Sequence, residues 1–157
     1  MVGLGSPTDK RPPYGAARGY FTGETWQDAV ANLAASSDFI VICVDDTAGV
    51  WWEVEQLVHR HLGKTLFLIH PRYAGAAENG LILARISQYF HGRPEVEGLQ
   101  AQGPSHLPAV IGFFRDRNGK LNLLQTSTFS RFAYLLALRA FVRQRLAPQT
   151  EVSGTVA

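Results

Sequence analysis

The sequence predicts an α/β fold, a three-layer flavodoxin-like or Rossmann-like domain built on a mostly parallel sheet. Two apolar runs, residues 39–44 and 65–70, have the length and β-branched content of strands that are covered on both faces. A helical pattern of apolar residues separates these runs, and further helical patterns precede and follow them. Such alternation of strands and helices is typical of doubly wound α/β sheets.

Length and composition describe one domain with a single core. The chain has 157 residues, of which 46% are hydrophobic and 18% are charged. We expect the domain to occupy residues 1–147 and a flexible tail to follow over residues 148–157. The formal net charge of +2 does not favour a nucleic-acid partner.

The sequence also excludes some kinds of site. The single cysteine, Cys43, excludes an internal disulfide and a cysteine-built metal site, and its place inside a strand predicts an inert core residue. The five histidines are not spaced as metal ligands. No apolar run reaches the roughly 18–20 residues that cross a bilayer, and no signal-peptide pattern opens the chain. We therefore expect a cytoplasmic domain.

The first third of the chain predicts one strand and one helix. Residues 2–7 are typical of a short buried strand that ends in a Gly/Pro turn. Glycines and prolines over residues 8–19 predict a loop. Thr22 is a candidate N-cap, and the apolar spacing over residues 26–33 predicts the helix that follows.

The middle of the chain continues the alternation. Apolar spacing predicts a helix over residues 50–62, between the two apolar strands, and Gly63 ends it. A further helix is expected over residues 80–90. The many glycines and prolines of residues 91–108 predict a long surface loop.

The last third predicts a hairpin and a helix. Residues 109–114 are a strand candidate, the Asn118–Gly119 pair is a strong turn signal, and residues 121–124 provide a return strand. Ser130 is positioned to cap a final helix that extends to Leu146. Arginines crowd this helix, and they indicate either contact with an anionic membrane or a partner, or a solvated helix face.

The strongest candidate site follows the first of the two apolar strands. In open α/β sheets, ligands bind beyond the carboxyl ends of the strands, where the loops 5–20, 45–49 and 70–80 are expected to meet. Asp46 and Thr47 lie in the second loop, and Glu53 follows near the start of the helix. A glutamate there can hydrogen-bond ribose hydroxyls or stabilise an oxocarbenium-like centre. The alternative is structural, with Asp46 or Thr47 capping the helix.

Further ligand contacts are predicted near the N-terminus. Gly3, Gly5 and Ser6 could cradle a phosphate with main-chain N–H groups, and Arg18 could clamp it. A plain tight turn and a solvated arginine are the alternatives, because the dinucleotide and P-loop motifs are absent.

The adjacent tryptophans of the second helix point in different directions. Trp51 and Trp52 lie about 100° apart on a helix. One is expected in the core. Trp52 is the candidate for stacking on a base or a nicotinamide ring, and packing roles for both rings are the alternative.

Five segments between Gly15 and Pro71 carry a family resemblance. They are Gly15–Arg18, Trp26–Gln27, Ser37–Ile42, Ala48–Glu53 and Lys64–Ile69. Together they resemble bacterial Rossmann-like domains that look like distant relatives of TIR domains and of the nucleoside 2-deoxyribosyltransferase-like superfamily. The resemblance also implies a place on the cytoplasmic face of a membrane, as part of a longer, membrane-attached protein.

The resemblance implies a helix-borne catalytic glutamate and a nucleotide ligand, NAD or a nucleoside. The transferase-like pattern acid-x-x-Gly-x-x-x-Glu points to Glu53, whereas the TIR-like pattern Trp-x-x-Glu points from Trp52 to Glu55. The implied reaction is cleavage or transfer at an N-glycosidic bond. The alternative is a non-catalytic TIR-like signalling module that acts by self-association as a homo-oligomer.

Overall fold

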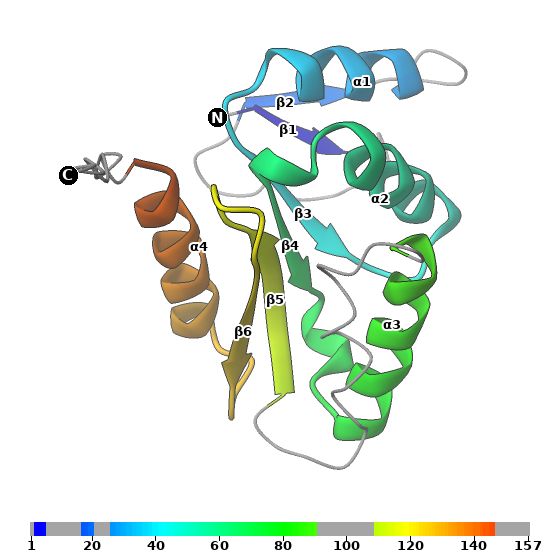
Figure 1. Cartoon of the computed structure of the whole chain (residues 1–157). Helices are drawn as coiled ribbons and strands as arrows, with labels where there is room; N and C mark the ends of the chain where they lie inside the picture. The colour runs from blue at the N-terminus through cyan, green and yellow to red at the C-terminus, as the bar shows by residue number, and fades with distance from the viewer. Residues whose placement is uncertain (1, 6–16, 21–25, 91–108, 147–157) are drawn as a thin grey trace, which may run out of the picture.

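A mixed four-stranded sheet forms the centre of the computed structural model, which describes residues 2–5, 17–20, 26–90 and 109–146 (Figure 1). The strand order is β3–β4–β5–β6. β3 pairs in parallel with β4, whereas β4–β5 and β5–β6 are antiparallel pairs. The bounds are Ile40–Val44 for β3, Thr65–Ile69 for β4, Ala109–Arg115 for β5 and Leu121–Thr126 for β6.

The expectation of a mostly parallel sheet is therefore wrong, although the α/β class and the C-terminal hairpin are confirmed. Two of the three strand pairs in the central sheet are antiparallel. Apolar alternation does not encode strand direction. The long connection over residues 91–108 leaves either direction open for β5, whereas a short helical crossover would have required a parallel strand.

Two short strands near the N-terminus form a sheet of their own. β1 (Val2–Gly5) pairs in parallel with β2 (Ala17–Tyr20), with Gly3 opposite Arg18. The first strand is thus confirmed, but it pairs with β2 in a separate sheet and is not part of the central one. The expected loop is wrong for residues 17–19, because this short, glycine-containing strand has no apolar run to signal it.

Four α-helices surround the sheet, as the sequence predicts. Their bounds are Trp26–Ser36 for α1, Ala48–Arg60 for α2, Ala76–Tyr89 for α3 and Arg131–Leu146 for α4. Short 3₁₀ turns, η2 (Leu62–Lys64) and η3 (Pro71–Tyr73), flank β4. The Ser130 hydroxyl accepts a hydrogen bond of 3.2 Å from the Ala133 N–H, which confirms the predicted cap of α4. Within the described ranges, no helix is long and apolar enough to cross a membrane.

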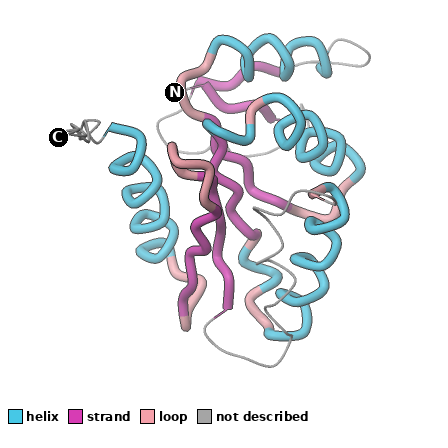
Figure 2. Tube along the Cα trace, viewed as in Figure 1, coloured by secondary structure: helices cyan, strands magenta, loops and turns pink. Residues whose placement is uncertain are grey.

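The helices cover both faces of the sheet (Figures 1 and 2). On one face, α2 and α3 close the larger core over β3, β4 and β5; its fully buried members include Val44, Val54, Val58, Phe67, Ile69, Ile86 and Phe113. On the other face, Phe141 of α4 packs against Leu66 and Phe114. The smaller core on this side leaves part of β3 uncovered.

The uncovered part of β3 overturns one expectation. Cys43 is exposed, not a core residue, and Val41 on the same face is 49% exposed. Phe39 makes an edge contact with Phe141 of α4 at a centroid distance of 5.9 Å. β3 is an edge strand, and this face of it is left partly uncovered because α4 lies over β4 and β5 in the middle of the sheet (Figure 1).

One buried polar residue joins α3 to the sheet. The Asn79 side chain donates a 2.8 Å hydrogen bond to the Val110 carbonyl and accepts one of 3.1 Å from the Val110 N–H. The register between β5 and β6 shifts between Val110 and Gly112. Asn79 therefore satisfies main-chain groups beside an irregularity in the ladder.

Candidate functional site

The carboxyl ends of β3 and β4 bring two of the predicted loops together. The His70 N–H donates a 3.1 Å hydrogen bond to the Val44 carbonyl, which holds the two strand ends side by side. Asp45 forms an ion pair with Arg72 and accepts a 3.1 Å hydrogen bond from the Tyr73 hydroxyl. Of the third predicted loop, residues 5–20, Gly5 and residues 17–20 belong to β1 and β2, and residues 6–16, Ser6 among them, lie outside the described residues.

Asp46 organises a stack of side chains beside this edge. Its carboxylate accepts a 2.9 Å hydrogen bond from the Trp51 indole and pairs with Arg85 of α3. The Arg85 guanidinium lies 4.4 Å from the centre of the Trp51 ring, a cation–π distance. The Tyr89 ring stacks on the Trp51 ring, with ring centroids 5.3 Å apart and an interplanar angle of 6°.

These contacts give the acidic loop a structural role. The Thr47 hydroxyl accepts a 3.3 Å hydrogen bond from the Val50 N–H and caps α2, which confirms the structural alternative for Thr47. Asp46 is not the cap, since it holds Trp51 and Arg85. A role for Asp46 or Thr47 in binding a ligand stays a prediction.

Glu53 lies on α2 one turn after Gly49. The two positions share one side of the helix, and a Cβ atom added at Gly49 would lie 3.9 Å from Trp26 of α1. Glu53 is half-buried, and burial raises the pKa of its carboxyl to about 7. Among the described residues, no hydrogen bond or ion pair reaches this carboxyl. The group therefore keeps its proton to near-neutral pH and has its acceptor and donor capacity available.

Glu55, the second candidate, faces elsewhere. It is exposed, and two helical positions rotate it about 200° from Glu53. The two carboxyls therefore cannot act on one ligand atom from the same side of α2.

The tryptophans divide as the sequence analysis expected. Trp51 is buried. Trp52 is half-buried and makes an edge-to-face contact with Trp26, with ring centroids 5.0 Å apart and an interplanar angle of 70°. This contact joins α1 to α2 on the side of Gly49. Stacking of a ligand ring on Trp52 stays a prediction.

The N-terminal phosphate contacts are only partly described. Gly3 and Gly5 lie within β1, where they pair with Arg18 and Tyr20 of β2. This placement makes them strand residues, so the tight-turn alternative does not hold for Gly3 and Gly5. Their contact with a phosphate and that of Arg18 stay predictions.

Sequence reasoning missed the cations of the site. Arg72 and Arg85 pair with acids 27 and 39 positions away, and such distant pairing leaves no local spacing signal. His70 is a different case, because the sequence places it at the end of a strand, where it could reach the site. Its Nδ1 accepts a 3.2 Å hydrogen bond from the Arg72 N–H and caps the short η3 turn.

The comparisons with known proteins give no relative. No protein-family model matches the chain, and neither the curated proteins nor the solved structures contain a match. In the described part of the chain, no group of three or more His, Cys, Asp or Glu residues is placed to hold a metal ion.

Proposed function

We propose that this domain binds NAD or a nucleoside and cleaves or transfers at its N-glycosidic bond, with Glu53 as the key carboxylate. The observation that carries the proposal is the state of Glu53: a half-buried carboxyl, raised by burial to a pKa of about 7, without a partner in the described residues. Perturbed carboxyls of this kind concentrate at functional sites. Their burial is costly and brings no evident gain to the fold.

The proposed chemistry uses the ionised form of Glu53. As the bond between the ribose C1′ and the base nitrogen breaks, its electron pair leaves with the base and positive charge develops on the sugar. A carboxylate in a partly dehydrated setting stabilises that charge more strongly than one in water. Water or an acceptor hydroxyl then bonds to C1′ and releases a proton, which Glu53 is suited to accept.

The fold agrees with this proposal. β3, α2 and β4 form a parallel strand–helix–strand unit, the building block of Rossmann-like sheets, and we assign the chain to that architecture as part of the proposal. Glu53 lies on the helix of this unit, in its second turn.

The test is proton NMR of the domain with NAD, and separately with purine nucleosides, followed over hours. We expect signals of the free base to grow with wild type and with Glu55→Gln, and to be absent with Glu53→Gln. Near-UV circular dichroism of each variant checks that the fold is intact. Equal turnover by wild type and Glu53→Gln would refute the role of Glu53, and no turnover with any substrate would refute catalysis.

A second candidate function is self-association as a TIR-like signalling module. The outer face of α4 supports it, because Phe132, Leu135 and Leu136 are 66%, 58% and 47% exposed. Analytical ultracentrifugation should then show a concentration-dependent homo-oligomer that Leu135→Lys dissociates. A strict monomer at high concentration would exclude this function.

A further inference from the structure

The helix α4 carries apolar residues on both of its sides. On the inner side Ala137 and Phe141 are buried, and Phe141 packs against the sheet. On the outer side Phe132, Leu135 and Leu136 are exposed. A helix that is apolar on both sides is normally covered on both sides, whereas α4 is the outermost of the described elements on its face of the sheet (Figure 1). Packing within the described part of the chain therefore does not account for these three exposed side chains.

Two arginines share the outer side of α4. Arg139 follows Leu135 by four positions, and Arg143 follows Arg139 by four more. Spacings of three, four and seven place them on one side of the helix together with Phe132 and Leu136. Both arginines are exposed, and in the described ranges no hydrogen bond or ion pair engages their guanidinium groups. The outer face of α4 thus combines apolar surface with uncompensated positive charge.

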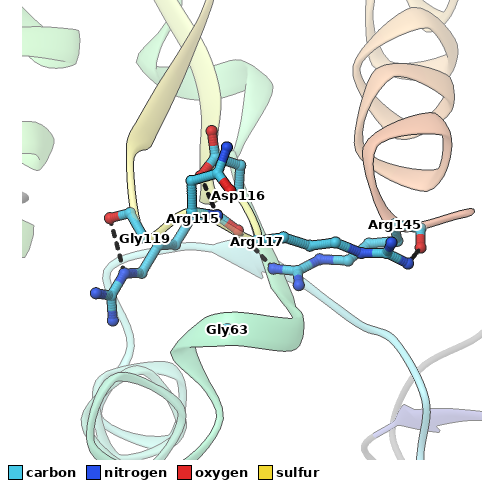
Figure 3. A pocket seen from close by; sticks show the side chains of 7 residues that line it. Gly63, Arg115, Asp116, Arg117, Gly119 and Arg145 are labelled. Carbon is cyan, nitrogen blue, oxygen red and sulfur yellow. Dashed lines mark hydrogen bonds between the residues drawn. The ribbon is translucent and has the colours of Figure 1, made fainter. Parts of the chain in front are cut away.

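Contacts near both ends of α4 hold this face away from the sheet. Near the start, the Tyr134 hydroxyl donates a hydrogen bond to the Ile69 carbonyl. At the end, the Arg117 guanidinium donates to the main-chain carbonyl of Arg145, and the Arg145 guanidinium donates to that of Arg115 (Figure 3). The helix cannot roll about its axis without breaking these contacts, so its outer face keeps one direction.

The charge of the chain is unevenly distributed along the sequence. No acidic residue occurs between Asp116 and Glu151. The charged residues of this stretch are Arg117, Lys120, Arg131, Arg139, Arg143 and Arg145. Since the whole chain has 15 basic and 13 acidic residues, the remainder carries a net negative charge. The small positive net charge of the chain therefore hides a basic region that includes α4.

We propose that the outer face of α4 binds the surface of an anionic lipid membrane. Phe132, Leu135 and Leu136 would enter the interfacial layer, and Arg139 and Arg143 would contact the lipid phosphates. Helices that present Phe and Leu beside arginines bind membrane surfaces in this way, and anionic lipids attract the arginines. The long arginine side chains reach the headgroups while their apolar stems stay at the interface.

The charge of this face favours lipid over a second copy of the chain. Two copies that dock through the same face bring like charges together, whereas anionic headgroups compensate them. An exposed helix is convex and fits a flat surface along its length. The proposal does not depend on the N-glycosidic function, because α2 with Glu53 packs on the opposite face of the sheet.

The test is co-sedimentation of the whole chain with vesicles of phosphatidylcholine alone, and with vesicles that also contain phosphatidylglycerol. We expect wild type to bind the mixed vesicles at least about tenfold more tightly than the neutral ones. Arg139→Gln should weaken this binding about fivefold, and Leu135→Ser about tenfold or more. Both positions are exposed, so neither variant alters the core.

Matched variants on the other face of the sheet make the same chemical changes elsewhere. Arg60→Gln removes an exposed arginine from α2, and Leu81→Ser removes a leucine of α3 that is 73% exposed. Both should bind the mixed vesicles as wild type does. Glu53→Gln should also bind them as wild type does, whatever its effect on turnover.

Three results would overturn the proposal. The first is the same affinity for both kinds of vesicle, or none for either. The second is equal weakening by Arg139→Gln and Arg60→Gln, which would indicate general attraction by the charge of the whole protein. The third is an oligomer in analytical ultracentrifugation that Leu135→Ser dissociates, without vesicle binding by wild type, which would assign the face to contact between copies.

Discussion

The indole N–H of Trp51 donates a 2.9 Å hydrogen bond to the carboxylate of Asp46, which lies just before the helix that carries the tryptophan. The same carboxylate pairs with Arg85, whose guanidinium lies over the Trp51 ring. One acid thus joins the strand end, α2 and α3. Because Asp46 makes these contacts, substituting it tests whether the aspartate has a structural role.

Asp46→Ala should lower the free energy of unfolding by about 1 kcal/mol, since it removes a hydrogen bond and an exposed ion pair. Urea denaturation at pH 7 measures the change. Asp38→Ala removes an exposed aspartate from the turn before β3 and should change the stability by less than about 0.5 kcal/mol. Equal effects of the two variants would contradict the structural role of Asp46.

Glu53 predicts a distinctive pH dependence of stability. Its pKa is raised from 4.5 to about 7 in the folded state, so between these values the folded protein holds a proton that the unfolded chain releases. Stability should therefore fall as the pH rises from about 4.5 to about 7, and level off above that. Glu53→Gln should remove this dependence and be the more stable protein at pH 8, by roughly 2 kcal/mol after allowance for solvent screening.

Urea denaturation at several pH values between 4.5 and 8 tests the Glu53 prediction. Glu55→Gln, which removes an exposed carboxyl from the same helix, should keep the pH dependence of the wild type. If the stability curves of wild type and Glu53→Gln run parallel, the Glu53 carboxyl is not desolvated in the folded protein.

The Asn79 side chain should be a major source of stability. Asn79→Ala leaves the Val110 N–H and carbonyl beside α3 without their two hydrogen bonds, so the free energy of unfolding should fall by about 2–3 kcal/mol. Thermal unfolding measures the loss. Asn32→Ala, at an exposed position of α1, is the matched control and should cost little. A small effect at Asn79 would mean that water replaces the amide.

Gly112 should tolerate no side chain. A Cβ atom there would lie 2.6 Å from the Phe67 carbonyl oxygen and 2.9 Å from Leu68 Cδ2, closer than real Cβ contacts allow. Gly112→Ala should therefore destabilise the protein by about 1–3 kcal/mol, because the neighbouring strand must shift. Gly63→Ala has open space around the new methyl group and should change stability by less than about 0.5 kcal/mol. Chemical denaturation of both variants compares them directly.

Local signals explain the elements that the sequence predicts. The Asn118–Gly119 pair predicts the β5–β6 hairpin, and Gly119 indeed has a positive φ. Ser130 predicts the start of α4 through its hydroxyl, since an N-cap is a contact over three residues. These features depend on neighbouring residues alone, so one sequence suffices to find them.

The missed features depend on contacts between distant segments. β5 runs antiparallel to β4, and its direction depends on how the chain returns to the sheet after α3. The apolar run of β5 is compatible with a parallel or an antiparallel strand. Cys43 has the sequence neighbours of a core strand, but the position of α4 over β4 and β5 decides whether its face is covered. Likewise, Glu53 could be proposed from spacing, whereas its half-burial depends on the packing around α2.

The reversal of chain direction at β5 places the acidic loop of Asp46 and the β5–β6 turn at opposite ends of β4. β5 runs against β4, so its final residue and the hairpin turn lie beside the start of β4, whereas Asp46 lies near the end of β4. The five residues of β4 separate these ends by roughly 16 Å. Substitutions such as Asp46→Ala and Arg117→Gln should then be additive in a double variant, within about 0.5 kcal/mol. The sequence at either end can therefore change without a loss of stability at the other.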